Sequence, residues 1–492
     1  MNFSIPDHKA IRKSFAEGEE AVVALFGEVT AQVEELASQL EKQAGVLKDL
    51  QARLSKNSRN SGKPPSSDGY GKKNKTESLR KPGQNPNGGQ PGHKGHTLKR
   101  SENPDHTEMH TPDACENCQT SLEDVVVVGE EERQVYDIPA IRIEVTSHRA
   151  EIIICPECGM ENTGKFPESV GRGIRYGRGV KTWATYFGNQ HHIPLERTTQ
   201  IFEDLIGHGI SEGSLLKASE ELSECVRPST EATAELLRNA EVLEVDETGL
   251  RVKGKLHWLH VASSDLLTHY NVHEKRGKEA MDAAGILSDF EGTMLHDHWK
   301  SYFGYKNCRH GLCNAHHLRE LKFIGKQYEQ VWAGGMADLL LEIKEAVEKL
   351  KPDRDDFGSE EIGNFERRYN EIVNQGFADN PFTPPKEKKR GKVKKTPPLN
   401  LLTRLRDYKA ETLAFMYDFR VPFDNNAAER DVRMMKVKQK VSGCFRTIEG
   451  AERFACIRGY ISTARKNSKN IFEAIKDAFN GDPFIPDAAA QK

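Results

Sequence analysis

The stretch Val242-Leu243-Glu244-Val245-Asp246 decides the fold of this chain, because it has the composition of a buried strand that ends in an acid. A second stretch, Gly292-Thr293-Met294-Leu295-His296, leads into Asp297 in the same way. Between the two acids lie two alternating stretches, at residues 255–261 and 269–272, and a helical run at residues 278–290. After the second acid come a further strand at residues 310–314 and a helix at residues 315–323. The order strand, strand, strand, helix, strand predicts an α/β domain with the first acid on its central strand.

This order of elements is the layout of a ribonuclease-H-like core, in which the second acid follows the fourth strand. A third acid, Glu429, lies in the polar segment Asn425-Asn426-Ala427-Ala428-Glu429-Arg430 and is expected on a helix. Three carboxylates arranged in this way can share two divalent metal ions, which is the arrangement that drives in-line displacement at phosphorus. The alternative for any one of these acids is a solvated surface charge.

Several motifs in fixed order give the chain a resemblance to a known family. They are Val245-Asp246-Glu247-Thr248, Leu256-His257-Trp258, Arg276-Gly277, Leu295-His296-Asp297-His298-Trp299-Lys300-Ser301-Tyr302, Cys313-Asn314-Ala315-His316 and Asp424-Asn425-Asn426-Ala427-Ala428-Glu429-Arg430. From about residue 54 to about residue 478 the chain resembles the insertion-sequence-66 family of DDE transposases. Many relatives have Asp-Gly-Tyr where this chain has Asp297-His298-Trp299, so DNA contacts near His298 differ from the family pattern.

The resemblance implies a catalytic triad of Asp246, Asp297 and Glu429 that holds two Mg²⁺ (or Mn²⁺) ions per active site. It implies a bacterial transposase that cuts at the ends of an insertion sequence and joins the freed 3′-OH to target DNA. The implied partners are the terminal inverted repeats and the target DNA, a second copy of the chain in a homodimer or higher assembly, and accessory proteins of the same element. Two alternatives remain: a ribonuclease-H-like nuclease or resolvase without strand transfer, and a catalytically silent, zinc-containing DNA-binding protein.

Composition is typical of a large soluble intracellular protein, and the fold class expected from the order of elements and the resemblance is multidomain α+β. The 492 residues correspond to several domains at roughly 100–200 residues each. No stretch approaches the ~20 apolar residues of a membrane span, and the N-terminus does not resemble a signal peptide, so we expect a cytoplasmic, nucleoid-associated protein without membrane contact. The net charge is only −3, but residues 51–100 carry twelve Lys and Arg against two acids, a local charge of +10. This local charge favours a nucleic-acid partner.

The N-terminal region combines an apolar seam with this basic segment. Val33, Leu40, Leu47 and Leu54 recur every seven residues, with Leu36 and Leu50 at the complementary positions, which predicts a coiled coil or a helix packed on its own domain. Next comes a Ser-Lys-Asn-Ser-Arg-Asn-Ser motif that also resembles the family's. We expect it to begin a disordered arm whose basic side chains track phosphates, or a solvated linker. The arm's predicted DNA-binding residues are Lys56, Arg59 and Lys63.

Two Cys-x-x-Cys pairs predict a structural zinc site. Cys115, Cys118, Cys155 and Cys158 would present four thiolates to one Zn²⁺ in a zinc ribbon-like module, with strands such as 140–145 in the segment between the pairs. The alternative is disulfides or unrelated buried thiols. Cys313 and His316 form a further pair, interpreted as a positioning motif beside the catalytic strand, a structural pair, or part of a metal site.

The remaining segments are predicted to be mainly helical. Residues 195–205 and a second helix capped by Ser211 have helix-turn-helix spacing, with Lys217 as the DNA-binding residue, although a plain helical hairpin has the same pattern. Helical periodicity at 337–347 and 365–369, with a basic loop at 384–395, predicts an α-helical insertion that contacts DNA or contains a solvated linker. After Glu429, Arg430 is expected to position DNA and Arg433 and Lys436 to bind it, while Asn425 caps the helix or contacts DNA.

The expected domains are a helical coiled-coil segment (1–54), a basic DNA-binding arm (55–105), a zinc-binding module (106–168), a helix-turn-helix DNA-binding region (169–238), the two parts of a ribonuclease-H-like catalytic core (239–325 and 416–480), an α-helical insertion with its basic loop (326–415) and a tail (481–492).

Overall fold

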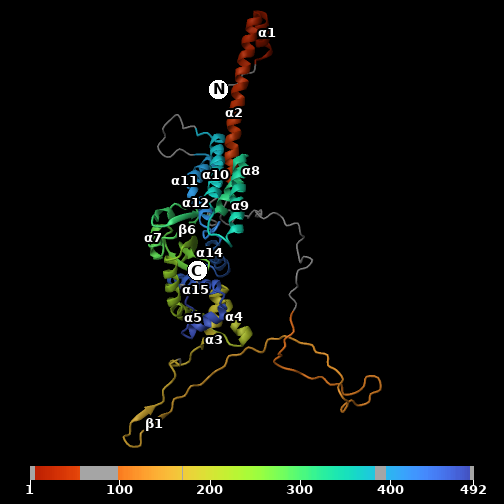
Figure 1. Ribbon diagram of the computed structural model, residues 1–492, viewed down its shortest axis with the longest axis vertical. Helices are drawn as coiled ribbons and strands as arrows, with labels where there is room; N and C mark the ends of the chain where they lie inside the picture. The colour runs from red at the N-terminus through yellow and green to blue at the C-terminus, as the bar shows by residue number, and fades with distance from the viewer. Residues whose placement is uncertain (1–5, 56–97, 169, 383–394, 488–492) are drawn as a thin grey trace. The chain divides into compact units, whose positions relative to one another are not determined.

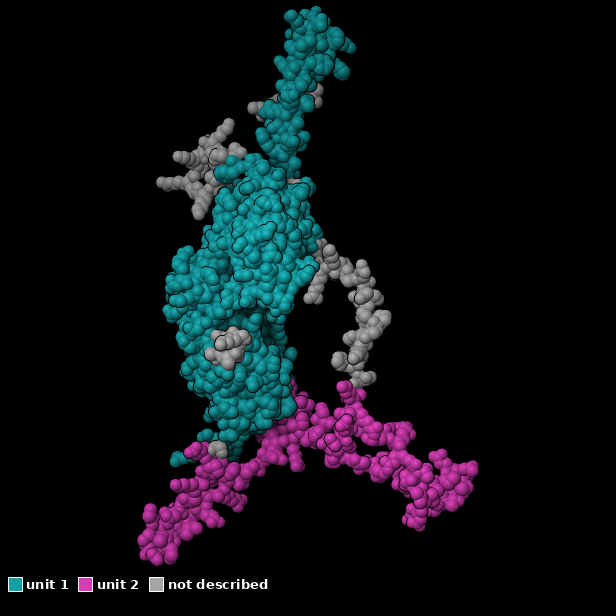
Figure 2. All heavy atoms as spheres, viewed as in Figure 1, with its two compact units in different colours: residues 1–72, 171–200, 210–492 teal, residues 73–170, 201–209 magenta. Residues whose placement is uncertain are grey.

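The computed structural model describes residues 6–55, 98–168, 170–382 and 395–487 (Figure 1). The chain divides into two compact units (Figure 2). Unit 1 comprises residues 1–72, 171–200 and 210–492, and unit 2 comprises residues 73–170 and 201–209. Within the described ranges, no helix is long and apolar enough to cross a membrane.

A five-stranded mixed sheet lies at the centre of unit 1, in the order β5-β4-β3-β6-β7. Its strands are β3 (Val242–Val252), β4 (Lys255–Ser263), β5 (Thr268–His273), β6 (Thr293–His296) and β7 (Arg309–Leu312). β3 pairs antiparallel with β4 and β4 with β5, whereas β6 and β7 extend the sheet in parallel with β3. The predicted order of strands is confirmed, and β3 is the central strand.

The two faces of the sheet bury different cores, because successive side chains of a strand point to opposite faces. Leu250 and Val252 pack with Val432 of α14 (Asn426–Ser442) and residues of α15 (Ile448–Lys466). Leu243 and Val245 pack on the other face with residues of α6 (Arg227–Arg238) and α7 (Lys278–Ala283). The central strand is therefore covered on both sides.

Two glycines with positive φ shape the connections around this sheet. Gly254 (φ 77°) follows Lys253 (φ 50°) in the two-residue turn that joins β3 to β4, a conformation that glycine adopts without steric cost. Gly285 (φ 66°) lies just beyond α7. The helical run predicted to reach residue 290 is therefore shorter than expected and ends at Ala283, because the left-handed backbone at Gly285 turns the chain.

The described residues form further helices and helical turns. They are α1 (His8–Glu17), α2 (Glu19–Ser55), α3 (Arg178–Thr185), a π-helical turn (Tyr186–Gln190), α4 (Leu195–Ile206), α5 (Glu212–Cys225), a 3-10 turn (Tyr302–Gly304), α8 (Asn314–Tyr328), α9 (Val331–Leu350), α10 (Ser359–Asp379), α11 (Pro397–Asp407), α12 (Lys409–Thr412), α13 (Ala414–Tyr417) and α16 (Ile471–Phe479).

The two helices predicted on either side of residues 207–209 are present as α4 and α5. Ser211 is the N-cap of α5, as expected, and its hydroxyl accepts a hydrogen bond from the Ser214 backbone nitrogen at 3.2 Å. Lys217 is exposed on α5.

The described residues between β7 and α14 are mainly helical, as predicted, and have their own hydrophobic core. Trp332 and Leu340 of α9 pack there with Tyr369 of α10. The same core includes Leu318 of α8 and Phe423, which precedes α14. The insertion therefore shares its core with α8, the helix that follows β7.

The N-terminal helices leave the heptad seam uncovered in the single chain. On α2, the side chains of Val33, Leu40 and Leu47 are 53%, 64% and 59% exposed. Such a row of exposed apolar residues is typical of a helix that packs against a partner.

In the described residues of unit 2, β1 (Ile152–Ile154) and β2 (Glu161–Thr163) form a short antiparallel hairpin. The strand predicted at residues 140–145 is wrong: these residues are extended without strand pairing, and Val145 is 91% exposed. Alternation alone does not make a strand, because a strand needs a neighbour that supplies hydrogen-bond partners. The hairpin instead surrounds the second Cys-x-x-Cys pair.

Candidate active site and metal-binding residues

Asp246 lies within β3, and Asp297 directly follows the neighbouring parallel strand β6, at a matching position. The pairing of β3 with β6 ends at Glu244 opposite Leu295, so each aspartate lies two residues beyond the last pair. The expectation that Asp246 ends its strand is wrong, because β3 continues to Val252 through its pairing with β4. The run of apolar residues stops at Asp246, but the backbone hydrogen bonds between β3 and β4 continue beyond it.

The first turn of α14 is attached directly to β3. The Asn425 side chain donates a hydrogen bond to the Val245 carbonyl at 2.8 Å. Glu244 accepts hydrogen bonds from the backbone nitrogens of Ala427 and Ala428, at 3.0 and 3.4 Å. Asn425 therefore occupies the N-cap position, but its side chain bonds to the sheet, and Glu244 satisfies the first nitrogens of the helix in its place.

Glu244 was not recognised from the sequence, where it is one polar residue in an apolar strand. It is 5% exposed, and burial raises its pKa to about 7. The sequence did place Glu244 two residues before Asp246 in the same predicted strand, and residues two apart on a strand share a face. Both side chains are therefore expected on the face of the sheet that α14 covers.

The two aspartates are held in an environment that disfavours their charged forms. Burial raises the pKa of Asp246 well above its usual range, and the negative charges of Glu247, Asp297 and Glu429 add to the effect. Burial and the charges of Glu247 and Glu429 raise the pKa of Asp297 to about 7, although its carboxylate accepts a hydrogen bond from the Trp299 nitrogen. Such repulsion is relieved by a bound cation, and an all-oxygen set of donors suits Mg²⁺.

Glu429 lies near both aspartates and uses its two oxygens differently. One oxygen, Oε2, forms an ion pair with Arg433 at 3.0 Å and lies 3.9 Å from a guanidinium nitrogen of Arg319. The other, Oε1, faces Nδ1 of His316 at 3.8 Å, and both of these atoms are buried without a hydrogen-bond partner. Donor atoms of Cys313, His316 and Glu429 lie within 4.8 Å of one another. Burial raises the pKa of Cys313 to about 12 and lowers that of His316 to about 4.

Glu247, next to Asp246 in sequence, has a separate set of partners. Arg276 donates from Nε to Glu247 at 2.9 Å, and its guanidinium lies over the rings of Trp258 and Trp299, at 4.8 and 4.2 Å. The Tyr302 hydroxyl donates to the other Glu247 oxygen at 2.5 Å. The Arg-Gly and Val-Asp-Glu-Thr motifs were recognised from the sequence, but this contact between them was not.

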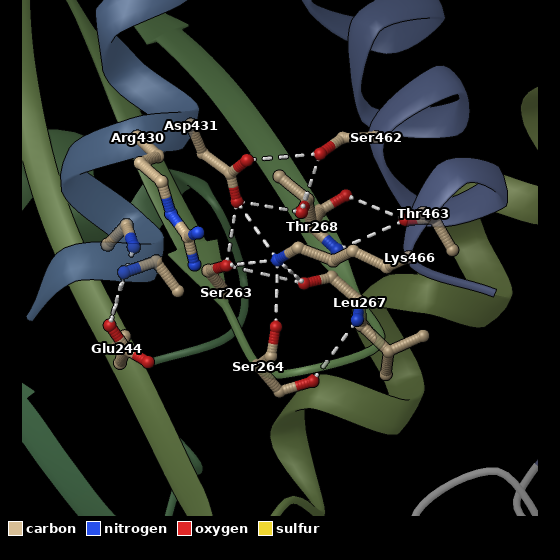
Figure 3. Close-up of polar contacts among 12 residues, drawn as sticks. Glu244, Ser263, Ser264, Leu267, Thr268, Arg430, Asp431, Ser462, Thr463 and Lys466 are labelled. Carbon is tan, nitrogen blue, oxygen red and sulfur yellow. Dashed lines mark hydrogen bonds and ion pairs between the residues drawn. The ribbon is translucent and has the colours of Figure 1, made fainter. Parts of the chain in front are cut away.

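A partly buried ion pair connects α14 to α15 (Figure 3). Asp431 lies 3.0 Å from Lys466 of α15 and accepts hydrogen bonds from Ser263 and Thr268 of the β4–β5 connection, at 2.8 and 2.9 Å. Lys466 also donates to backbone carbonyls of that connection. Since Asp431 is two residues beyond Glu429, this network restricts rotation of the helix that carries the third acid.

The two Cys-x-x-Cys pairs form turns with the same hydrogen bonds. In each turn, the backbone carbonyl of the first cysteine accepts a hydrogen bond from the nitrogen four residues later, and its backbone nitrogen donates to the carbonyl five residues later. In the first pair, Gln119 N donates to Cys115 O at 2.9 Å and Cys115 N donates to Thr120 O at 2.9 Å. In the second pair, Gly159 N donates to Cys155 O at 2.9 Å and Cys155 N donates to Met160 O at 2.8 Å. Gln119 and Gly159 both have left-handed backbones, with φ of 58° and 68°. Two unrelated segments thus adopt one loop geometry, in which both thiols are on the same turn.

The thiols of these turns are suited to metal binding, although the four are not brought together. Hydrogen bonds, first from Thr120, lower the pKa of Cys118 to about 7, and hydrogen bonds from Cys158 and Glu157 lower that of Cys155. All nine cysteines fall within the described residues, and each is a free thiol. In the described part of the chain, the only cluster of three or more possible metal-binding side chains is formed by Cys313, His316 and Glu429.

A family model described as Transposase IS66 family matches residues 173–453. The chain belongs to this family. The match includes the whole five-stranded sheet and Glu429 of this IS66-family transposase. A model described as the zinc-finger binding domain of transposase IS66 matches residues 112–159, which contain both cysteine pairs, and a family of unknown function matches residues 5–99. A comparison with curated proteins gave no match.

The predicted DNA-binding residues of the transposase differ in their surroundings. Lys56, Arg59 and Lys63 lie outside the described residues, as do residues 384–394 of the basic loop. Arg430 and Arg433 are exposed beside Glu429. Lys436, in contrast, is partly buried and donates to the Gly249 carbonyl at 2.9 Å, so its ammonium group already has a protein partner.

Proposed function

We propose that the chain is a DDE transposase that uses Asp246, Asp297 and Glu429 to cut DNA at the ends of an insertion sequence and to join the freed 3′-OH to target DNA. The observation that carries this proposal is the matching register of the two aspartates at the parallel strands β3 and β6, beside a helix whose first turn is bonded to β3. This arrangement also supports a ribonuclease-H-like core formed by residues 239–325 and 416–480.

The three acids are proposed to hold two Mg²⁺ (or Mn²⁺) ions, because their mutual repulsion leaves negative charge that cations would compensate. When bound, such ions lower the pKa of the attacking water and stabilise the leaving 3′ oxygen. The protein's own contribution is to fix the acids. Asn425 and Glu244 hold the start of α14 against β3, and Arg433 orients one oxygen of Glu429.

A cleavage and joining assay with full-length protein, Mg²⁺ and the terminal repeat of the element tests this proposal. The wild-type protein should give both nicked and joined products, and Asp246→Asn should give neither while binding DNA as before. Exposed Asp289 provides a matched control, Asp289→Asn, which should cleave normally. Nicks without joined products would favour a nuclease or resolvase, and binding without any product would favour a catalytically silent DNA-binding protein.

We propose that Cys115, Cys118, Cys155 and Cys158 bind one structural Zn²⁺ within residues 106–168. The identical turns of the two pairs support this, together with the match to a zinc-finger family. Binding requires the two turns to meet at one ion, so the metal itself would contribute to the folding of this module.

DNA binding outside the active site is proposed for the helix-turn-helix region, 169–238, with Lys217, and for the basic arm, 55–105. Deletion of residues 56–97 tests the arm. If the arm tracks phosphates, the deletion should weaken binding to every duplex and reduce the salt dependence by roughly 0.9 in slope for each lost phosphate contact. Unchanged affinity and slope would mean that the segment is a linker, and sequence preference should persist in either case.

The exposed seam of α2 is proposed to form a coiled coil with a second copy of the chain, which gives a homodimer or higher assembly. Four seam residues are more than half exposed in the single chain and support this: Val33, Leu40, Leu47 and Leu54. In sedimentation experiments, Leu40→Lys with Leu47→Lys should reduce the assembly to monomers. The off-seam control Gln39→Lys should leave it intact, and an unaltered assembly in the double variant would mean that the seam packs elsewhere.

A further inference from the structure

We infer that Cys313, His316 and Glu429 form a second metal site, which takes a borderline ion such as Zn²⁺ and uses the oxygen of Glu429 that faces away from Arg433. The site is separate from the cysteine pairs of residues 106–168, and it shares only Glu429 with the all-oxygen site proposed for the three acids. It contains one sulfur, one nitrogen and one oxygen donor, a set that Zn²⁺ accepts and Mg²⁺ does not favour.

The spacing of the donor atoms fits one tetrahedral ion. Zn–S bonds of about 2.3 Å and Zn–N and Zn–O bonds of about 2.0–2.2 Å place ligand atoms roughly 3.3–3.7 Å apart. In the structure, Nδ1 of His316 and Oε1 of Glu429 are 3.8 Å apart, and all three donors lie within 4.8 Å of one another. Movements of the three donor atoms by a few tenths of an ångström up to about 1 Å would bring them to these separations. The fourth position of a tetrahedral ion would be left for water or another ligand.

Two of these donors are otherwise unexplained. His316 Nδ1 and Glu429 Oε1 are both buried, and neither has a hydrogen-bond partner. Buried polar atoms are nearly always paired, so two facing atoms without partners indicate a missing ligand between them. The 3.8 Å separation is too long for the two to satisfy each other directly.

The backbone around Cys313 supports a metal-bound sulfur. Cys313 is the N-cap residue of α8 and His316 lies in its first turn, so both start from one rigid helix end. The Asn425 backbone nitrogen donates to the Cys313 sulfur at 3.2 Å, which would stabilise a thiolate on a metal. Because the Asn425 side chain also bonds to Val245, one residue connects this sulfur to the catalytic strand.

The site would couple two metals through one carboxylate. An ion at Cys313 and His316 would hold Oε1 of Glu429 and orient the whole carboxylate toward the aspartates. This consequence for catalysis rests on the proposed function, whereas metal binding itself does not.

Metal content of the full-length protein, equilibrated with Zn²⁺ and freed of excess, tests the inference. His316→Ala and Cys313→Ser should each contain one zinc ion per chain fewer than the wild type. The matched controls Cys308→Ser and His317→Gln change a buried cysteine and a buried histidine that are not ligands, and they should retain the wild-type content. Equal zinc in wild type and His316→Ala, with both folded by circular dichroism, would refute the site.

Two further measurements keep the test decisive if Cys313→Ser fails to fold. The His316 side chain is 24% exposed, so its truncation should be tolerated better, and added Zn²⁺ should raise the melting temperature of the wild type more than that of His316→Ala. Co²⁺ loading should give a mixed sulfur and nitrogen spectrum that His316→Ala loses. Asp246→Asn should keep this zinc and lose cleavage, so a failure of the catalytic proposal is distinguishable from a failure of the metal site.

Discussion

Replacing Asp297 by Asn should stabilise the metal-free protein at neutral pH. The pKa of this carboxyl rises from an ordinary value of 3.8 to about 7 on folding, mainly through burial and then through the charge of Glu247. At 1.36 kcal/mol for each pH unit, this corresponds to an upper limit of about 4 kcal/mol. Because the carboxyl group is partly exposed, screening reduces the expected gain to about 1–2 kcal/mol.

The sign of the effect depends on pH in a defined way. The folded state binds the proton more tightly, so the cost of the charged carboxylate is absent below about pH 4, develops between about pH 4 and 7, and is complete above pH 7. Asp297→Asn should therefore match the wild type at pH 4 and exceed it at pH 8.

Urea denaturation in the presence of a chelator measures this difference. Asp289→Asn, which changes an exposed aspartate shortly before β6, should show no such dependence on pH. Adding Mg²⁺ should stabilise the wild type and have little effect on Asp297→Asn, since one metal ligand is lost. A variant that is destabilised at pH 8, or equally stabilised at pH 4, would contradict the electrostatic reasoning.

Three further predictions concern the other acids, the zinc and the partly buried ion pair. Glu429→Gln should abolish DNA cleavage with DNA affinity retained, while exposed Glu452→Gln leaves cleavage unchanged; full cleavage by Glu429→Gln would remove this residue from the triad. Cys158→Ser should lose zinc in metal analysis and become sensitive to proteolysis within residues 113–164, and unchanged zinc content would argue against the four-cysteine site. Lys466→Ala should lower the free energy of unfolding by about 1–3 kcal/mol, because the partly buried Asp431 would lose its cation; an unchanged free energy of unfolding would mean that water replaces the ammonium group.

Local patterns predicted the strands of the central sheet, their order along the chain and the N-cap at Ser211, because each depends on neighbouring residues. The position of Asp246 inside β3 was not predictable in this way. It depends on β4, whose pairing continues the strand past the end of the apolar run. The failed strand at 140–145 shows the converse, since its alternation lacks a neighbouring strand.

The parts of the candidate site that the sequence could not give are long-range contacts. Glu244 satisfies backbone nitrogens 183 and 184 residues later, and Asn425 bonds to a carbonyl 180 residues earlier. Neither residue has a local pattern that indicates its partner. The three acids, in contrast, were recognisable because each lies in a motif of its own.

The attachment of α14 to β3 has a consequence for the protein during its synthesis. The chain must be translated through Glu429 before the third acid exists, and through Lys466 before the ion pair that restrains its helix can form. A ribosome-bound chain that has folded β3 through β7 would carry two aspartates without the third acid. On the proposed function, such a nascent or prematurely terminated chain should be unable to nick DNA, so that cleavage begins only once the third acid is in place.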